Sequence, residues 1–323
     1  MPGSGNSLVT WGRCVRLSLL PTALADAMAG FALAGMVGLP AGKELLLFVS
    51  SAGIYHGAMA LNDWADREKD SIERPERPIP SGAISSGAAL LATAALFLIG
   101  LLAAATLSLQ LLAWMTAISV VAIAYDLRLR GPLLGPMCLG VCRAMHLAAP
   151  AIWLAPERLQ SYWALPVGYG LYVFTLSRLA RLEERSTEDL GSAPTKLLLI
   201  QALSFTGPLL YAAQLSHTWF LQNIERAEAT NAHLPWLSTV SPVAPIVLLA
   251  LFGGGVLLRQ CRSAKSWTPA KVQAAVGKAL RLMLIFTAAS ALTAGGILGP
   301  IAALLILLGY PLAHSLRKIF PPT

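Results

Sequence analysis

A short charged stretch of this sequence contains side chains that could bind a metal ion. Residues 61–84 read LNDWADREKDSIERPERPIPSGAI and carry ten charged residues, in a chain of which only 12% is charged. Spacings of three, four and seven residues return to one face of a helix, and four oxygen-bearing side chains follow them: Asn62, Asp63, Asp66 and Asp70. Crowded carboxylates repel each other, and a divalent cation relieves that repulsion. Because Mg²⁺ prefers oxygen ligands and takes one or two carboxylates together with substrate phosphates, the spacing predicts a Mg²⁺ site.

Basic side chains in the same stretch suit the phosphate groups that such a metal would accompany. They are Arg67, Lys69, Arg74 and Arg77. Guanidinium groups bind phosphate oxygens through charge-assisted hydrogen bonds, so the acids and bases together predict a site for Mg²⁺ and a diphosphate. The alternative is a solvated loop whose charges serve solubility and orientation. Such a loop would need neither the helical spacing of the acids nor the rigid segment RPERPIPSG at residues 74–82.

The helices that carry this site are predicted to cross a membrane. The chain has 323 residues, 56% of them hydrophobic, a mean hydropathy of +0.64, and about half the charged fraction of a typical soluble domain. Ten apolar segments can be drawn: Leu17–Leu39, Leu45–Leu61, Ala88–Leu107, Leu111–Tyr125, Leu133–Leu154, Tyr162–Leu176, Leu197–Leu215, Val240–Leu258, Leu280–Gly295 and Ile297–Ala313. Repeated runs of this kind indicate transmembrane helices. We expect an all-α fold, a polytopic membrane bundle of about nine or ten transmembrane helices around a central cavity open to the cytoplasmic side, with residues 1–323 as one domain.

The distribution of Lys and Arg predicts the orientation of this bundle. Basic residues gather before the first segment, in every second connection and at the end of the chain, whereas the other connections hold only Lys43, Arg158 and Arg226. Because cytoplasmic connections carry the excess of Lys and Arg, we expect both termini and the active-site loops on the cytoplasmic side of an integral, multi-pass protein. The net charge of +8 does not indicate a nucleic-acid partner, since no basic run is interleaved with aromatic residues.

Two charged residues lie inside apolar segments. They are Asp26 in the first segment and Arg143 in the fifth. A charge at this depth is costly and usually faces a polar interior, so each is a candidate functional residue, with a hydrogen bond between helices as the alternative. His56 shares the helical face of Asp63, and His146 shares that of Arg143. For both histidines we favour a hydrogen bond within the bundle over a contact with substrate.

The sequence resembles a known enzyme family at two motifs. NDWADREKDSIERPERPIPSG, residues 62–82, resembles the first signature of the UbiA superfamily of intramembrane prenyltransferases. YDLRLRGPLLGPMCLGVCRAMH, residues 125–146, resembles a later segment of that superfamily and sets Tyr125, Arg130 and Arg143 on its positions. Within the superfamily we consider the branch called EboC-like. The resemblance implies helical membrane enzymes that use Mg²⁺ to move an isoprenoid chain from a prenyl diphosphate to an acceptor.

The second acidic motif of that superfamily is altered in this chain. The superfamily usually has two aspartates in the pattern DxxxD after the sixth segment, where this sequence reads SRLARLEERSTEDLG at residues 177–191. Alignment on Gly191 sets Glu183 on the first aspartate and Thr187 on the second. Glu184 and Glu188 are four residues apart, so they would share a helical face. We expect an altered second metal set composed of Glu183, Glu184 and Glu188.

The resemblance and the residues together predict a prenyltransferase. Its first metal set would be Asn62, Asp63, Asp66 and Asp70, of which Asp63 and Asp66 act in catalysis together with Arg130. Contacts to the prenyl diphosphate donor are expected from Arg67, Arg74, Arg77, Tyr125, Arg143, Arg178 and Arg181. The acceptor is not identified by the sequence, and the lipid bilayer is the remaining partner. The alternative is a UbiA-like membrane protein that binds or transports an isoprenoid with little or no turnover, which the altered second motif favours and the intact first motif opposes.

Overall fold

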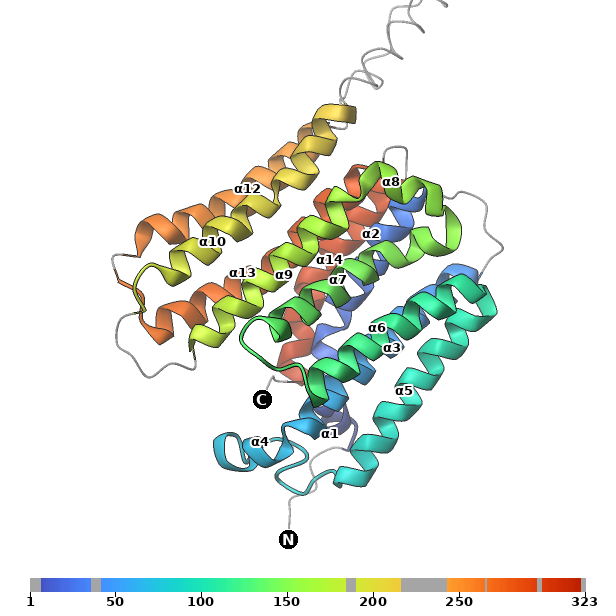
Figure 1. Cartoon of the computed structure of the whole chain (residues 1–323), viewed down its shortest axis with the longest axis vertical. Helices are drawn as coiled ribbons and strands as arrows, with labels where there is room; N and C mark the ends of the chain where they lie inside the picture. Colours follow the sequence, from blue (N-terminus) through green and yellow to red (C-terminus); the bar gives the residue numbers. More distant parts are fainter. Residues whose placement is uncertain are drawn as a thin grey trace, which may run out of the picture.

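All regular structure in the described part of the chain is helical. The computed structural model describes residues 7–35, 42–183, 190–215, 243–264, 266–294 and 298–320 (Figure 1). Its helices are α1 (Ser7–Cys14), α2 (Leu20–Ala34), α3 (Lys43–Ala65), α4 (Arg67–Glu73), α5 (Ser86–Leu107), α6 (Leu109–Leu127), α7 (Leu134–Leu154), α8 (Leu159–Tyr162), α9 (Ala164–Glu183), α10 (Ala193–Ser204), α12 (Val243–Ser263), α13 (Pro269–Leu292) and α14 (Leu298–Ile319). Short 3₁₀ turns precede α2 and α8 at Leu17–Leu19 and Pro156–Arg158.

The prediction of nine or ten membrane-spanning helices is confirmed. Among the described residues, nine helices are long and apolar enough to cross a membrane, and the helix that begins with α10 continues to Leu215. Helix α9 is not among the nine, because arginines and a glutamate occupy its last turns, yet it packs against α7, α10 and α13. It therefore belongs to the bundle. Helices α13 and α14 lie on either side of the expected break at Gly295–Gly296, which falls outside the described residues.

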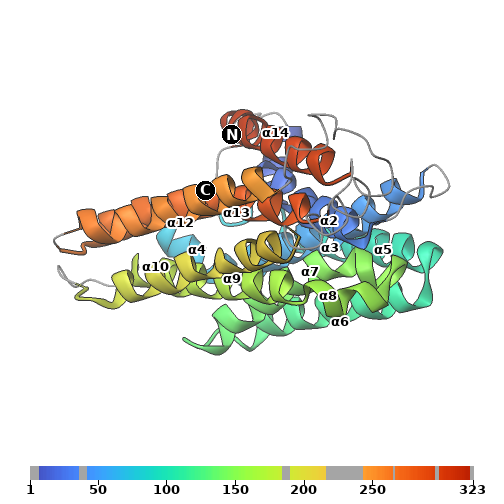
Figure 2. The ribbon, with the colours of Figure 1, turned by 90° about the horizontal axis from the view of Figure 1, so that it is seen from above.

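The bundle extends from α5 at one edge to α10 and α12 at the other (Figure 1). Seen from above, α12 and α13 lie over α10 and α9, while α6, α7 and α9 follow one another in the layer beneath (Figure 2). Helix α2 contacts α3, α7, α13 and α14, so it lies at the centre. Residues of α2, α3, α6, α7, α9 and α13 therefore enclose the middle of the bundle.

Side-chain caps mark where several helices begin. The hydroxyl of Ser85 accepts a hydrogen bond from the amide of Ala88 at 3.2 Å, and that of Ser108 accepts one from Leu111 at 3.0 Å. Ser108 both ends α5 and caps α6, so these two helices form a tight hairpin. Helix α13 begins at Pro269, well before the predicted Leu280, because Thr268 caps it and proline is favoured in a first turn.

The chain bends in the middle of the acidic stretch. We predicted that the acids lie along one continuous helix, but α3 ends at Ala65 and the separate short helix α4 begins at Arg67. Residue Asp66 forms the junction. After α4 the proline-containing segment makes a series of turns, with Gly82 in the left-handed region at φ 76°, before α5 begins.

Candidate active site

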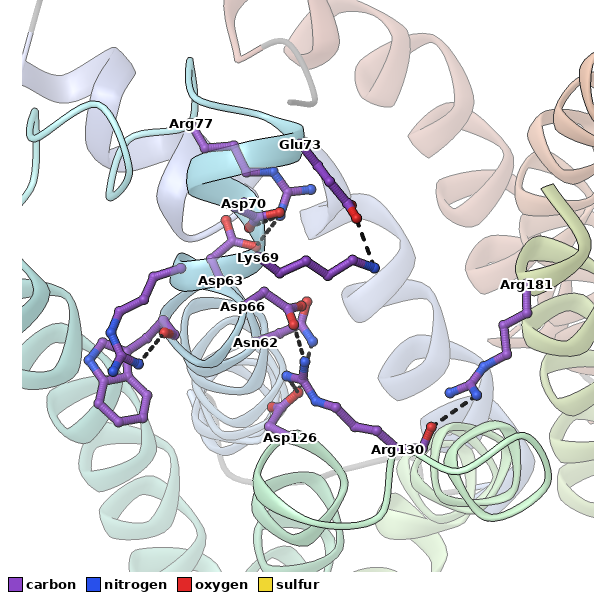
Figure 3. Close-up of polar contacts among 12 residues, drawn as sticks. Asn62, Asp63, Asp66, Lys69, Asp70, Glu73, Arg77, Asp126, Arg130 and Arg181 are labelled. Carbon is purple, nitrogen blue, oxygen red and sulfur yellow. Dashed lines mark hydrogen bonds and ion pairs between the residues drawn. The ribbon is translucent and has the colours of Figure 1, made fainter. Parts of the chain in front are cut away.

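The predicted oxygen-bearing side chains converge, although on two helices rather than one. Asn62 and Asp63 lie in the last turn of α3, Asp66 lies at the bend, and Asp70 lies on α4. Figure 3 shows Asp70 folded back toward Asp63, with Asp66 and Asn62 beneath them. Asp63 and Asp70 are only 4% and 3% exposed. The helical spacing thus predicted that these residues lie together, and the bend at Asp66 brings Asp70 onto the others.

Arginines neutralise these carboxylates in the structure. The Nη2 of Arg16 donates to Oδ1 of Asp63 at 2.5 Å and also reaches Oδ1 of Asn62 at 3.3 Å. Buried Arg77 donates through Nη1 to Oδ2 of Asp70 at 2.5 Å and lies 3.7 Å from Oδ1 of Asp63. The repulsion that we expected among the acids is therefore relieved by guanidinium groups.

A further aspartate from α6 completes the network. Arg130 forms an ion pair with Asp66, and its Nη2 lies 3.6 Å from Oδ1 of Asp126 (Figure 3). The amide nitrogen of Asn62 donates to the same Oδ1 of Asp126 at 2.9 Å. We call this set the acidic cluster: four aspartates and three arginines, namely Asp63, Asp66, Asp70, Asp126, Arg16, Arg77 and Arg130. One negative charge remains after pairing, and the cluster joins the N-terminal segment, α3, α4 and the end of α6.

Arg16 is held in a conformation that few side chains adopt. Its φ of 52° and ψ of 49° lie in the left-handed region, which is uncommon outside glycine and is often found at functional sites. Burial lowers the pKa of its guanidinium, but the charge and hydrogen bond of Asp63 raise it, and the net pKa is above the ordinary value. Arg16 therefore remains cationic beside Asp63.

The oxygen donors of the acidic cluster fit Mg²⁺ by their chemistry. Mg²⁺ takes one or two carboxylates and completes its octahedron with water and substrate phosphates. Within the described residues no three His, Cys, Asp or Glu side chains already form a metal-binding group, because arginines lie between the carboxylates. Of the predicted second set, Glu183 is the last residue of α9, while Glu184 and Glu188 lie outside the described residues.

The other predicted arginines are distributed around the cluster. Arg67 stacks over Trp64 at 4.4 Å and donates to the carboxylate of Glu68 at 3.2 Å, whereas Arg74 is exposed to solvent. Arg178 donates to the carbonyl of Pro132 at 2.5 Å. Arg181 donates to the carbonyls of Arg130 and Gly131 at 3.0 and 2.9 Å. Both arginines of α9 therefore brace the loop that carries Arg130.

An apolar cavity opens directly onto the acidic cluster. Its volume is about 380 Å³, and Arg16, Tyr125 and Asp126 form its polar mouth. Its walls come from α3, α6, α7, α9 and α13 and are mostly hydrophobic: Ile54, Ala58, Met59, Ile118, Ala122, Leu139, Val173, Leu176, Val276 and Met283. Because Arg16 and Asp126 belong to both features, the cluster and the cavity form one site.

The two intramembrane charges pair with each other beside this cavity. The Nη1 of Arg143 donates to Oδ2 of Asp26 at 2.7 Å, and the hydroxyl of Tyr169 donates to Oδ1 at 2.8 Å. The guanidinium also stacks over the rings of Tyr55 at 4.8 Å and Tyr169 at 5.9 Å. Arg143 and Tyr55 line the cavity, whereas Asp26 is fully buried. The ion pair thus joins α7 to α2, and the Tyr169 hydroxyl joins α9 to the same carboxylate. Charges buried in a membrane protein need such partners inside the bundle.

The two bundle histidines are hydrogen-bonded to backbone carbonyls, as predicted. Nδ1 of His56 lies 2.8 Å from the carbonyl oxygen of Val15, and Nδ1 of His146 lies 3.1 Å from that of Cys142. Sequence reasoning missed Arg16 and Asp126 as site residues. Asp126 directly follows Tyr125 in the second motif, whereas the sequence presents Arg16 only as one of the basic residues before the first apolar segment.

Comparison with known proteins decides the family. Residues 23–277 match the model of the UbiA prenyltransferase family, which covers more than half of the chain. The chain belongs to the UbiA prenyltransferase family. The predictions of a helical membrane prenyltransferase and of Mg²⁺ as its metal are confirmed at the level of the family, and the alternative without turnover is not favoured.

Relatives and solved structures agree with this assignment. The chain is 30% identical to the digeranylgeranylglyceryl phosphate synthase of Methanopyrus kandleri over 260 residues, which cover 76% of this chain and 86% of that protein. It is also 30% identical to the synthase of Methanothrix thermoacetophila over 174 residues, 54% of this chain and 61% of that protein. Two UbiA homologues have a similar fold, each with a TM-score of 0.58. One is from Aeropyrum pernix; it is 19% identical, and the match covers 84% of this chain and 96% of that one. The other, from Archaeoglobus fulgidus with DMAPP and Mg²⁺ bound, is 14% identical, and the match covers 94% of this chain and 99% of that one.

Proposed function

We propose that this enzyme binds a prenyl diphosphate with its diphosphate at the acidic cluster and its isoprenoid tail in the cavity. The observation that carries the proposal is the shared boundary of the two: Arg16 and Asp126 belong to the cluster and line the apolar cavity. A charged head joined to an apolar chain needs this juxtaposition. Structures of UbiA homologues from Archaeoglobus fulgidus with GPP or DMAPP and Mg²⁺ support the same donor class.

Asn62, Asp63 and Asp66 are the residues that would hold Mg²⁺, together with Asp126 across the cluster. The ion would withdraw charge from the diphosphate oxygens as the bond to the first carbon of the tail breaks. Arg16 and Arg130 now bind carboxylates, and they would exchange these partners for phosphate oxygens. Asp70 holds Arg77 in place, so this pair serves to position the cluster.

The reaction has simple requirements that the cavity meets. The bond between the first carbon and oxygen breaks, and its electron pair leaves on the diphosphate. A nucleophilic atom of the acceptor bonds to that carbon, and its proton passes to water or to the departing diphosphate at the polar mouth. The apolar walls of the cavity exclude water from the allylic centre, which would otherwise be hydrolysed. The acceptor is a separate molecule that enters from the membrane side.

The second acidic set remains a proposal in altered form. Glu183 ends α9, the helix whose Arg181 braces the loop that carries Arg130. A glutamate side chain is one methylene longer than an aspartate, so it reaches the phosphates with less fixed geometry. We propose that Glu183, Glu184 and Glu188 support a second Mg²⁺ and that this altered set lowers the rate.

Binding of prenyl diphosphates tests the proposal. The purified enzyme in phosphatidylcholine nanodiscs would be titrated with non-hydrolysable prenyl thiodiphosphates of increasing chain length, with and without Mg²⁺. We expect Mg²⁺-dependent binding that Asp63→Asn and Asp66→Asn each abolish. Glu68→Gln is the matched control. This acid belongs to the same stretch, but its side chain is 86% exposed and forms an ion pair with Arg67 rather than with a residue of the acidic cluster. Binding that ignores Mg²⁺ and both aspartate variants would refute the assignment.

A further inference from the structure

Polar side chains interrupt the apolar lining of the cavity at one place. They are Tyr55 of α3 and Arg143 and His146 of α7, and all three line the cavity. The guanidinium of Arg143 lies over the Tyr55 ring at 4.8 Å, and His146 follows Arg143 by three residues, so the two share one face of α7. We call these three residues the polar patch. The lining residues from α9 and α13, in contrast, are mostly apolar.

The polar patch lies deep in the bundle, away from the acidic cluster. Asp63 lies in the last turn of α3, and Tyr55 precedes it by eight residues on the same helix. At 1.5 Å per residue, Tyr55 is about 12 Å from Asp63 along the helix axis. Helix α7 agrees with this depth, because it begins at Leu134, just after the loop that carries Arg130, and His146 lies about 18 Å further along it. A prenyl tail that starts at the cluster and follows the cavity inwards therefore meets the patch.

His146 has a hydrogen-bonding atom that the fold leaves unpaired. A carbonyl oxygen can only accept, so Nδ1 of His146 carries the proton that it donates to the carbonyl of Cys142 at 3.1 Å. In this tautomer Nε2 is a hydrogen-bond acceptor, and it is buried without a hydrogen-bond partner among the described residues. Beside it, Arg143 carries a permanent charge. A hydrocarbon tail offers neither a donor nor an acceptor, so tail atoms packed against the patch leave Nε2 unpaired and place apolar surface against a charge, which costs free energy.

We infer that the polar patch ends the tail-binding part of the cavity and thereby sets the preferred length of the prenyl donor. The inference rests on the proposed function, because it concerns the donor of the same site. Each isoprene unit adds four bonds of about 1.5 Å to the chain, which is about 5 Å when extended. A tail of about two to three units therefore spans the distance from the cluster to the patch. A fourth unit has to pack against Arg143 and His146 or leave the cavity.

Donors of different length test the inference through His146. The enzyme in phosphatidylcholine nanodiscs with Mg²⁺ would be titrated with prenyl thiodiphosphates of one, two, three and four isoprene units, and the wild type would be compared with His146→Leu. The ratio of the two affinities cancels the partition of the ligand into the bilayer, which is the same for both proteins. We expect His146→Leu to bind the four-unit donor about tenfold more tightly than the wild type, because the unpaired polar atom is gone. The affinities for the one-unit and two-unit donors should change by less than about twofold.

Gln201→Leu on α10 is the matched control. The amide nitrogen of Gln201 lies 3.4 Å from the carbonyl oxygen of Tyr172, and its Oε1 is buried without a hydrogen-bond partner among the described residues, as Nε2 of His146 is. Gln201 is not one of the residues that line the cavity. The substitution therefore removes the same kind of unpaired atom elsewhere in the bundle, and the affinity ratio should be equal at all four donor lengths. Melting temperatures verify that both variants fold.

A hydroxyl group on the terminal carbon of the donor locates the patch in the wild-type enzyme. Against apolar walls such a hydroxyl loses its hydrogen bonds to water, which weakens binding by about tenfold or more. At the patch it can donate to Nε2 of His146 instead. We expect the hydroxylated donor of two or three units to bind at least as tightly as its parent compound. This measurement needs no substitution, so it decides the question even if His146→Leu does not fold.

The outcomes separate this inference from the proposed function. A gain in affinity confined to the long donors in His146→Leu, together with a hydroxyl that is tolerated at two or three units, supports the inference. Equal affinity ratios at all lengths for a folded His146→Leu, or a gain for long donors that Gln201→Leu shares, overturn it while leaving the donor site standing. A hydroxyl that weakens binding equally at every length overturns it as well. Absence of Mg²⁺-dependent binding for every donor would refute the proposed function, and the inference with it.

Discussion

At the scale of single residues, the arginines of the acidic cluster explain how four aspartates can lie side by side. Arg16 and Arg130 come from distant parts of the chain and neutralise Asp63 and Asp66. Their partners are exchangeable, because phosphate and carboxylate oxygens suit the same guanidinium geometry. The acids themselves followed from the helical spacing in the sequence. The contact of Arg16 with Asp63 could not be predicted in this way, since 47 positions separate the two residues and no periodic pattern connects them.

Replacement of Arg16 tests this exchange of partners. We expect Arg16→Asn to weaken binding of a prenyl thiodiphosphate about tenfold or more, because one charged hydrogen bond to the phosphate is lost. Asparagine tolerates the left-handed backbone that Arg16 adopts, so the fold should persist. The measurement is isothermal titration calorimetry in nanodiscs, with melting temperature as the check on folding. Affinity equal to that of the wild type would show that Arg16 serves only to neutralise Asp63.

The intramembrane pair makes a second prediction at this scale. Removing one partner of a buried ion pair costs about 3–5 kcal/mol, whereas replacing both with apolar residues often costs little. We therefore expect Arg143→Met to lower the melting temperature strongly, because it leaves the Asp26 carboxyl fully buried with only the Tyr169 hydroxyl as a hydrogen-bond partner. Adding Asp26→Leu to that variant should recover part of the loss. A double variant less stable than Arg143→Met would contradict the pairing.

At the scale of helices, hydrophobicity located the spanning segments but not their polar ends. The prediction stopped α9 at Leu176, since Arg178 and Arg181 read as a connection, yet the helix continues to Glu183. It began the ninth segment at Leu280, although α13 starts at Pro269. The arginines at the end of α9 lie past the apolar core, where they contact the loop that carries Arg130. An apolar run indicates the part of a helix that lies in the hydrocarbon core of the membrane. It does not indicate how far the helix continues outside that core.

The packing of α7 on α9 gives a prediction at this scale. An added Cβ at Gly140 would lie 2.5 Å from the carbonyl oxygen of Gly170, and one at Gly170 would lie 3.0 Å from that of Gly140. Gly140→Ala should separate these helices and cost about 1–3 kcal/mol by overpacking, with a lower melting temperature. Gly255→Ala on α12 is the control, because nothing lies within 4 Å of its added Cβ, and it should be neutral or slightly stabilising. Equal melting temperatures for the two variants would contradict the close approach.

At the scale of the whole molecule, the two ends of the described chain meet. A Cβ on Gly12 of α1 would lie 2.3 Å from the ring of Phe320, which directly follows α14. Both ends therefore lie at the same end of the bundle, next to the acidic cluster, as expected when α9 is added to the nine apolar helices of the described residues. The basic residues of the sequence predict which side of the membrane this end faces. The contact between α1 and Phe320 shows in addition that the two ends lie together, which a count of charges cannot show.

We propose that this end is cytoplasmic, and labelling with a membrane-impermeant maleimide tests it. Ser81 is exposed in the turns before α5, at the end of the bundle that carries the acidic cluster, and Glu157 is exposed on the 3₁₀ turn after α7, at the opposite end. In a variant with its four cysteines replaced, Glu157→Cys should react in intact cells. Ser81→Cys should react only after permeabilisation, because its loop carries the arginines that the positive-inside rule retains on the cytoplasmic side. Reaction of Ser81→Cys in intact cells would show the opposite orientation of the bundle. The prenyl diphosphate would then have to reach the site from outside the cell.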